Sequence, residues 1–325
     1  MPRYDEFDVE SYDRPRRHTR PRTKDRPQHL DAVPGTVVTV DRGRYTTLVE
    51  GRTVLAMKSR PLGRKGVVVG DSVRIVGDLS GDEGSLARIV QVDDRRTVLR
   101  RTADDDDPVE RVIVANAEQL VVVVSLADPE PQPRFLDRAL VAAYDAGLTP
   151  LLCLTKADLA DPEPLLATYR PLGVPFVVTE HARELAALRE RLHDTVSVMI
   201  GSSGVGKSTL VNALVPGSER AIGHVNAVTG RGRHTSTSAL MLALPGGGWI
   251  VDTPGIRSFG LAHVQPAQLI NAFPDLAGAT EGCPRGCTHG GDEPECGLDD
   301  VAAAGGTEPE RVASFRRLLA SREQT

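Results

Sequence analysis

The sequence predicts a three-part chain that consists of a small β-barrel, a parallel α/β domain and a short helical module rich in cysteine. Three observations predict it. Five short β-branched runs separated by glycine-containing turns occupy residues 34–101. Apolar strands alternate with helices from residue 119 to residue 214, and three of the four cysteines fall within residues 283–296. A chain of 325 residues is long enough for two or three domains.

An N-terminal tail precedes these three parts, so we expect four segments: a disordered basic tail at 1–33, an OB-fold barrel at 34–102, the α/β domain at 103–262 and the helical module at 263–325. The tail has four prolines, many charges and no periodicity, which is typical of disorder. Its basic stretch from Arg14 to Arg26 is consistent with a solvated leader or with an arm that grips nucleic-acid phosphates. The chain has no apolar run of 18 residues and no signal-peptide core, so we expect a cytoplasmic protein without a membrane partner.

The barrel is predicted from five runs, at Thr36–Val40, Thr46–Val49, Thr53–Met57, Ser72–Val76 and Ala87–Val92. Residues 34–101 carry 13 Lys and Arg against 8 Asp and Glu, whereas residues 102–325 carry 18 against 29. This asymmetry indicates a polyanion bound at the barrel. Tyr45 is the only aromatic residue of the segment, so contact with RNA would depend on basic side chains at Arg42, Arg44, Lys58, Arg60, Arg64 and Lys65. A purely structural barrel is the alternative.

The central segment reads as continuous apolar strands separated by helices, which indicates a parallel sheet covered on both faces. After Asp104–Asp107, read as a solvated linker, the pattern gives strands at Gln119–Leu126, Pro150–Thr155, Val174–Val178, Val196–Ile200 and Trp249–Val251. The helices are expected at Arg134–Ala146, after Pro162, at Ala182–Leu192 and at Ser208–Leu214.

A phosphate-binding loop is predicted between the strand at 196–200 and the next helix. The pattern G-x-x-x-x-G-K-[ST] is met by Gly201, Ser202, Ser203, Gly204, Val205, Gly206, Lys207 and Ser208, with Thr209 following. Lys207 is expected to pair with the β- and γ-phosphates, while Ser208 ligates Mg²⁺. Asp252 at the end of a later strand is expected to bind Mg²⁺ through water, and Gly255 to contact the γ-phosphate.

The base is predicted to be guanine. Guanine presents two adjacent donors, N1–H and the 2-amino group, which one carboxylate can accept, whereas adenine presents an acceptor at N1. Thr155-Lys156-Ala157-Asp158 resembles the Asn-Lys-x-Asp motif of GTPases, with Asp158 on the base edge and the Lys156 stem across the ring. Thr155 stands where an amide usually braces the site, and a plain surface loop is the alternative. The companion loop at Thr179–Glu180 matches the usual Ser-Ala poorly.

The order of these motifs indicates a circular permutation. The base motif at 155–158 precedes the phosphate loop at 201–208, whereas Ras-like proteins have the reverse order. All of these motifs follow strands of one sheet, so they still meet at the same edge. The permutation therefore keeps the site and moves the termini.

A structural zinc site is predicted in the last segment. Cys283, Cys287, His289 and Cys296 have the ligand types and spacing of a closed Cys₃His centre. Cys153 lies in an apolar strand and is expected in the core. A final helix at Pro309–Ser321 is also expected. Its arginines either bind RNA or line a solvated face; they are Arg311, Arg316, Arg317 and Arg322.

Together, over roughly residues 34–325, these motifs resemble the bacterial ribosome small-subunit-dependent GTPase A family. Gly230-Arg-Gly-Arg-His234-Thr235-Ser236 is similar to its first switch, with Ser236 in place of a second Thr but still able to ligate Mg²⁺. In the cysteine loop, the first spacer between ligands is one residue shorter than in the family, and the last spacer is one residue longer. The resemblance implies a late assembly factor that binds the small ribosomal subunit and its rRNA and leaves after GTP hydrolysis; we expect a monomer.

Ras-like enzymes orient the attacking water with a Gln directly after the Asp-x-x-Gly motif, but Ile256 stands there in this chain. His234 is the nearest replacement, and the alternative is a solvated loop residue. Two other functions stay open. One is a GTP-sensing binding module that barely turns over, and the other is a small-molecule P-loop kinase.

Overall fold

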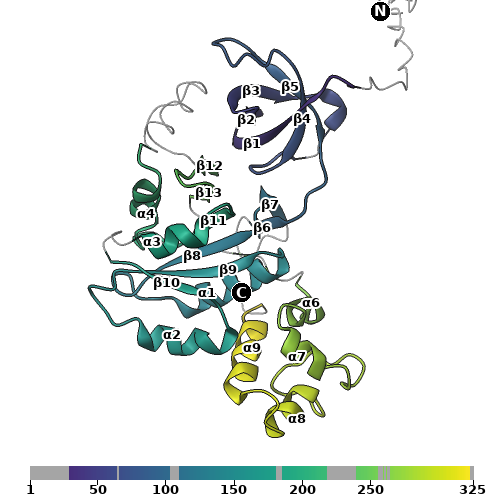
Figure 1. Ribbon diagram of the computed structural model, residues 1–325. Coiled ribbons are helices and arrows are strands. Elements are labelled where there is room, and N and C mark those ends of the chain that lie inside the picture. The colour runs from purple at the N-terminus through teal and green to yellow at the C-terminus, as the bar shows by residue number, and fades with distance from the viewer. Residues whose placement is uncertain are drawn as a thin grey trace, which may run out of the picture. The chain divides into compact units, whose positions relative to one another are not determined.

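The computed structural model describes residues 29–63, 66–102, 110–180, 185–217, 239–254, 259, 261 and 264–322. The chain divides into two units, Met1–Asp31 and Ala32–Thr325. Of the first unit only residues 29–31 are described, so most of the predicted basic tail lies outside the described residues. The helices and strands that the structure describes all lie in the second unit (Figure 1).

Five strands form the N-terminal barrel: β1 (Val33–Asp41), β2 (Arg44–Val49), β3 (Arg52–Lys58), β4 (Ser72–Gly77) and β5 (Ala87–Val92). They pair in the order β1-β2-β3-β5-β4, and β4 pairs back onto β1, which closes the sheet. A short 3₁₀ turn, η2 (Arg60–Leu62), follows β3. The alternating inward side chains, among them Val37, Val54 and Ile75, are fully buried. The predicted OB-type barrel is confirmed.

A two-stranded ribbon that the sequence did not predict follows the barrel, formed by β6 (Val98–Thr102) and β7 (Glu110–Ala115). Its end is held to the barrel by two hydrogen bonds of 2.9 Å, from Ala115 N–H to the Val69 carbonyl and from the Asn116 side-chain amide to the Gly70 carbonyl. The predicted linker at Asp104–Asp107 lies outside the described residues.

The central sheet is parallel, as predicted, with one exception. Its parallel strands are β10 (Phe176–Val178), β9 (Thr149–Thr155), β8 (Gln119–Ser125), β11 (Val196–Ile200) and β13 (Trp249–Asp252), in that spatial order. The exception is β12 (Leu240–Ala243), which runs antiparallel to β13. Its outer side meets the barrel at one pair, Leu240 opposite Thr39. All seven residues of β8 are buried, which explains its continuous apolar run.

Helices cover both faces of this sheet (Figure 1). They are α1 (Pro133–Asp145), α2 (Glu163–Tyr169), α3 (Ala186–Leu192) and α4 (Lys207–Leu214), and η3 (Arg170–Leu172) continues α2. Leucines of α3 and α4 pack with Val121, Val123 and Cys153 in one core, and α1 packs in the other. Cys153 is fully buried, as expected, and its burial raises the thiol pKa to about 12.

The described part of the C-terminal module contains four helices: α6 (Pro266–Ile270), α7 (Pro274–Ala279), α8 (Gly297–Ala303) and α9 (Pro309–Ser321). Phe273 ties the module to α1, because its ring lies edge-on to Tyr144 at 5.0 Å and to Phe315 of α9 at 5.4 Å between centroids. Within the described ranges, no helix of the chain is both long and apolar enough to cross a membrane.

The arginines of the last helix fit neither reading of the sequence. Each is bonded inside the molecule, and the partners are the carboxylates of Asp275, Asp299 and Asp137 for Arg311, Arg316 and Arg317, and the Val264 carbonyl for Arg322. They therefore dock the helix rather than form a free basic face. A sequence cannot reveal this, since the partner of Arg317 lies 180 positions away on α1.

Candidate nucleotide site and metal centre

The loop predicted to bind phosphate lies between β11 and α4. Gly206 has φ of 92°, in the left-handed region, and the helix begins at the next residue, Lys207. At Gly201 a Cβ atom would approach the Val123 carbonyl oxygen to 2.7 Å, so the loop crosses β8 too closely for a side chain. These two glycines let the backbone bend over the sheet edge, in the arrangement that aims successive N–H groups at phosphates.

Lys207 and Asp252 meet at this edge of the sheet. The ammonium group of Lys207 donates a hydrogen bond to the Asp252 carboxylate, and both side chains are mostly buried. Asp252 ends β13, which is paired directly with β11, so the sheet register brings the two residues together. The Thr253 hydroxyl next to it donates to the Met199 carbonyl at 2.8 Å and fixes the chain as it leaves the strand. An ammonium group can bind a phosphate and a carboxylate can bind a divalent cation, so this pair has the chemistry that the predicted site requires.

Thr155 joins the predicted base loop to the phosphate loop. Its hydroxyl oxygen, at the end of β9, lies 2.6 Å from the Val205 carbonyl and 3.2 Å from the Val124 carbonyl, and the side chain is buried. The shorter contact crosses from β9 to the residue before Gly206. A threonine hydroxyl at this position therefore still braces the two loops, although the amide of the usual Asn is absent.

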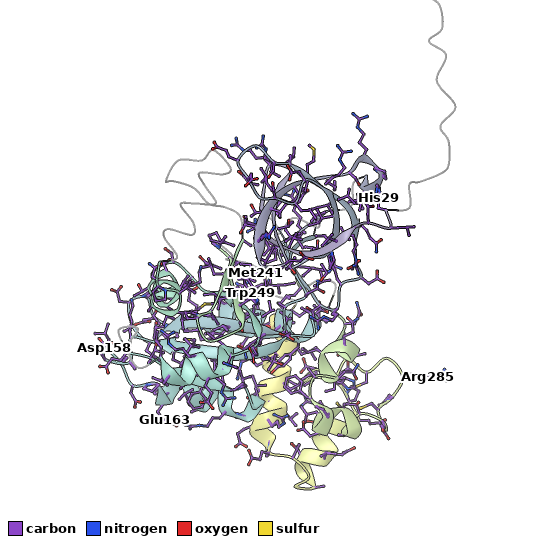
Figure 2. All side chains as sticks on the ribbon, turned by 45° about the horizontal axis from the view of Figure 1, so that its top comes forward. His29, Asp158, Glu163, Met241, Trp249 and Arg285 are labelled. Atoms are coloured by element: carbon purple, nitrogen blue, oxygen red, sulfur yellow. The ribbon has the colours of Figure 1, made fainter. Side chains whose placement is uncertain are left out.

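Lys156 and Asp158 extend from the same loop. Lys156 adopts φ of 59° and its ammonium group donates to the Asp128 carbonyl, in the loop after β8. Asp158 is exposed at the outer edge of the α/β domain (Figure 2). Ala157 N–H donates to the Thr179 carbonyl at 3.4 Å, so the companion loop that the sequence indicated lies beside the base loop. Asp128 was missed because its contact uses a backbone carbonyl; only its place after the neighbouring strand could have suggested it.

Several predicted site residues lie outside the described residues. They are His234, Thr235 and Ser236 of the first switch, together with Gly255 of the second. The described part of the site therefore consists of the phosphate loop, the base loop and Asp252. All three lie at the carboxyl ends of parallel strands in one sheet, β9, β11 and β13, where open α/β sheets bind their ligands.

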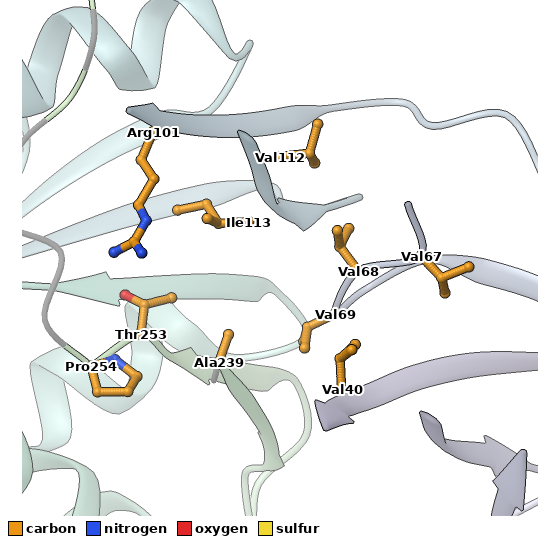
Figure 3. A pocket seen from close by; sticks show the side chains of 10 residues that line it. All are labelled: Val40, Val67, Val68, Val69, Arg101, Val112, Ile113, Ala239, Thr253 and Pro254. Carbon is orange, nitrogen blue, oxygen red and sulfur yellow. The ribbon is translucent and has the colours of Figure 1, made fainter. Parts of the chain in front are cut away.

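A cavity of about 220 Å³ is lined on one side by Thr253 and Pro254, the two residues after Asp252 (Figure 3). Its walls come from the barrel, from the β6–β7 ribbon and from Thr253 and Pro254. Most of its lining is aliphatic, and Arg101 is the one charged side chain among the lining residues. The residues of the phosphate loop do not line it, whereas Thr253 and Pro254 of the Asp252–Gly255 motif do.

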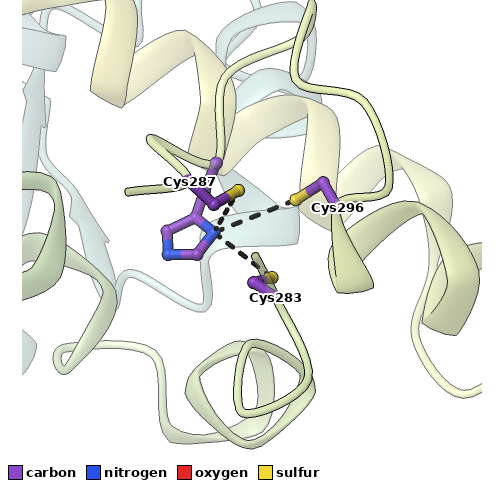
Figure 4. A group of neighbouring side chains, drawn as sticks. Cys283, Cys287 and Cys296 are labelled. Atoms are coloured by element: carbon purple, nitrogen blue, oxygen red, sulfur yellow. Dashed lines mark hydrogen bonds between the residues drawn. The ribbon is translucent and has the colours of Figure 1, made fainter. Parts of the chain in front are cut away.

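The four predicted metal ligands come together in the C-terminal module (Figure 4). Nδ1 of His289 lies 3.4, 3.7 and 3.8 Å from the sulfurs of Cys287, Cys283 and Cys296. All four donor atoms lie within 4.8 Å of one another, so the group can hold a metal ion. Desolvation raises the pKa of the Cys287 thiol to about 11, and burial lowers the pKa of the His289 imidazole. A bound cation would favour the thiolate instead.

Two neighbours hold these ligands in place. Gly297 N–H donates to the sulfur of Cys283 at 3.2 Å, and a Cβ atom at Gly297 would come within 2.2 Å of the Ala279 carbonyl oxygen. Arg316 donates to the His289 carbonyl at 3.2 Å from α9. Such outer contacts orient the ligands of a metal centre. The centre is therefore built into the packing of α7, α8 and α9.

The comparisons with known proteins agree with this site. A family model described as RsgA GTPase matches residues 92–262. The "Small ribosomal subunit biogenesis GTPase RsgA" of Pseudomonas aeruginosa is 39% identical over 255 residues, which cover 76% of this chain and 74% of that protein. The protein of the same name from Azotobacter vinelandii is 42% identical over 219 residues, 64% of this chain and 63% of that one.

Two solved structures share the fold. YjeQ from Thermotoga maritima has a TM-score of 0.67 and 26% identity, and the match covers 90% of this chain and 99% of that one. YloQ, described as a circularly permuted GTPase, has a TM-score of 0.65 and 20% identity, with 92% and 98% covered. Fold, motif order and site together define a circularly permuted P-loop GTPase, an enzyme that hydrolyses GTP. Within that class, the chain belongs to the RsgA GTPase family.

Proposed function

We propose that this GTPase binds the small ribosomal subunit and couples GTP hydrolysis to a late step of its maturation and to its own release. The observation that carries the proposal is the 39% identity, over three quarters of this chain, to a protein named for small-subunit biogenesis. The enzyme would act as a cytoplasmic monomer. Its working parts are the barrel at 34–102, the GTPase domain at 103–262 and the metal-binding module at 263–325.

In the nucleotide site, Lys207 neutralises the β- and γ-phosphates and the P-loop amides surround them. Mg²⁺ is held by Ser208 and, through water, by Asp252, with Thr235 and Ser236 closing the site from the first switch. Asp158 accepts the two donors of guanine. The contact between Lys207 and Asp252 supports these roles, because it puts the two charged groups within reach of one phosphate–Mg²⁺ unit.

The metal in the C-terminal module is proposed to be zinc. A tetrahedral zinc ion with Zn–S of about 2.3 Å and Zn–N of about 2.0 Å needs sulfur–nitrogen separations of about 3.5 Å. The separations from His289 to the three sulfurs, 3.4–3.8 Å, agree with that geometry. Four protein ligands leave no open position, so this ion stabilises the module and takes no part in hydrolysis.

The barrel is proposed to contact ribosomal RNA through its phosphates. Its one aromatic residue, Tyr45, is 6% exposed and belongs to the barrel core, which leaves no ring on its surface for base stacking. The excess of 13 basic over 8 acidic residues at 34–101 supports electrostatic binding. Subunit binding should therefore weaken steeply as salt rises. A double variant, Arg42→Glu with Arg44→Glu, should weaken it further without changing GTP binding.

The deciding experiment measures GTP hydrolysis by the full chain with and without purified small subunits, with large subunits as the control. The rate of GTP hydrolysis should rise when small subunits are added and should not change when large subunits are added. A rate that no subunit changes would contradict the proposal and favour a module that acts through GTP occupancy. A phosphorylated small molecule as the product would identify a kinase instead.

A further inference from the structure

Helix α1 carries two adjacent charged residues that are almost completely buried. Asp137 is 4% exposed and Arg138 is 8% exposed. Buried charges are costly unless they are paired or hydrogen-bonded, so each of these side chains needs partners. Both find partners on other elements, and neither contributes to the nucleotide or metal sites described above.

Arg138 bonds to two segments that are far apart in the sequence. Its guanidinium donates to the Phe259 carbonyl from one nitrogen and to the Ser321 carbonyl, at 3.2 Å, from another. Phe259 comes four residues after Gly255, the residue predicted to contact the γ-phosphate, and its buried ring packs against Phe135 of α1. Ser321 is the last residue of α9. One side chain therefore joins the exit of the second switch to the C-terminal helix.

Asp137 gives α1 a second hold on the same helix. Its carboxylate pairs with Arg317 of α9 at 3.1 Å, and the Arg317 guanidinium lies 5.1 Å from the centroid of the Tyr169 ring. A third contact on α9 differs from these two. Arg311 binds Asp275 and, at 2.6 Å, the Pro171 carbonyl, both of which lie away from Phe259 in the sequence. Among the described residues, Arg311 thus docks the helix without a hydrogen bond to Phe259.

We propose that Arg138 is a positioning residue that couples the nucleotide state of the site to the docking of α9 and the metal-binding module. The guanidinium is planar and its donors point in fixed directions, so it satisfies both carbonyls only at one relative position of Phe259 and Ser321. A displacement of Phe259 breaks the hydrogen bond between its carbonyl and this buried guanidinium, which costs free energy. Two discrete arrangements of Phe259 relative to α9 are therefore favoured over a continuous range of positions.

The coupling is reciprocal. If the bound nucleotide changes how α9 docks, then a change in the docking of α9 must change the affinity for that nucleotide. The inference rests on the GTPase activity for the existence of two nucleotide states. It rests on the proposed function only for what the module does on the subunit.

The test compares the full chain bound to GDP with the full chain bound to a non-hydrolysable GTP analogue, without ribosomes. Hydrogen exchange of the amides of α9 is followed by mass spectrometry in the wild type, Arg138→Met, Arg138→Lys and Arg311→Met. In the wild type, the exchange of the last turn should differ about fivefold or more between the two nucleotides, as in typical allosteric couplings. Arg138→Met should abolish the difference, and Arg311→Met should keep it.

A second readout separates coupling from a purely structural role. The ratio of the dissociation constants for the GTP analogue and GDP should change in Arg138→Met and stay as in the wild type in Arg311→Met. If Arg138→Met does not fold, Arg138→Lys, which keeps the charge but loses the planar fork, should reduce the difference in exchange. Equal exchange of wild-type α9 in both nucleotide states overturns the inference, as does an unchanged ratio in Arg138→Met. Failure to respond to small subunits would refute only the proposed function.

Discussion

Replacing Thr155 by valine removes the hydroxyl that links the base loop to the phosphate loop and keeps the shape of the side chain. The Val205 carbonyl, 2.6 Å away, then loses this donor. An unpaired buried acceptor costs about 1–3 kcal/mol. If that cost falls on the binding-competent arrangement of the two loops, the affinities for GTP and GDP both fall, by at most about 5- to 150-fold.

Affinity is measured by titration with a fluorescent GDP and GTP analogue, and stability by thermal unfolding. Thr47→Val is the matched control, because the Thr47 hydroxyl is also buried and donates to a backbone carbonyl at 3.0 Å, but inside the barrel. Both variants should lose similar stability, and only Thr155→Val should lose nucleotide affinity. Equal affinities in the two variants, with equal losses of stability, would show that the Thr155 bond supports the fold and not the site.

Four further outcomes are expected. Asp158→Asn should lose the preference for GTP over ATP in competition binding, because the amide directs a donor at the donors of guanine. A chelator or Cys287→Ser should unfold residues beyond about 280, as detected by limited proteolysis, and leave GDP binding intact. The Arg311 bond lowers the pKa of Asp275. The pair therefore contributes its full stability above the ordinary Asp pKa of about 3.9, and this contribution is lost as the pH falls through the lower pKa of the folded state. In acid unfolding, Arg311→Met should lose less stability than the wild type over this pH range. His234→Ala should keep GTP and subunit binding and lose most of the subunit-stimulated rate; wild-type stimulation would exclude His234.

Where a segment's own residues decide its structure, the sequence was sufficient. The strand at Val196–Ile200 and the helix at Pro309–Ser321 have the predicted bounds. The first is a short apolar run between polar residues, and the second begins with a proline at its first turn. The cluster of three cysteines and His289, which could hold a metal ion, was also predictable, since the cysteine and histidine spacing is itself the signal.

Where a partner decides the structure, the sequence was not sufficient. The four residues Leu240–Ala243 form a strand because β13 lies beside them, and a run so short fits a helix equally well. Asp137 and Arg138 look like ordinary charges on a helix, and only tertiary packing, with α9 and Phe259 among the partners, buries them. Asp128 acts through its carbonyl, a group that every residue has.

The single pair between Thr39 and Leu240 has a practical consequence for anyone who shortens this chain. In the intact unit the outer side of β12 faces β1, so the α/β sheet has a neighbour on that side. Removal of the barrel at residue 102 would leave β12 as a bare edge strand, with unpaired amides beside the apolar side chains of Leu240, Met241 and Leu242. Exposed apolar edges recruit strands from other molecules. An isolated GTPase domain should therefore self-associate, which makes full-length variants the better material for assigning roles to the barrel.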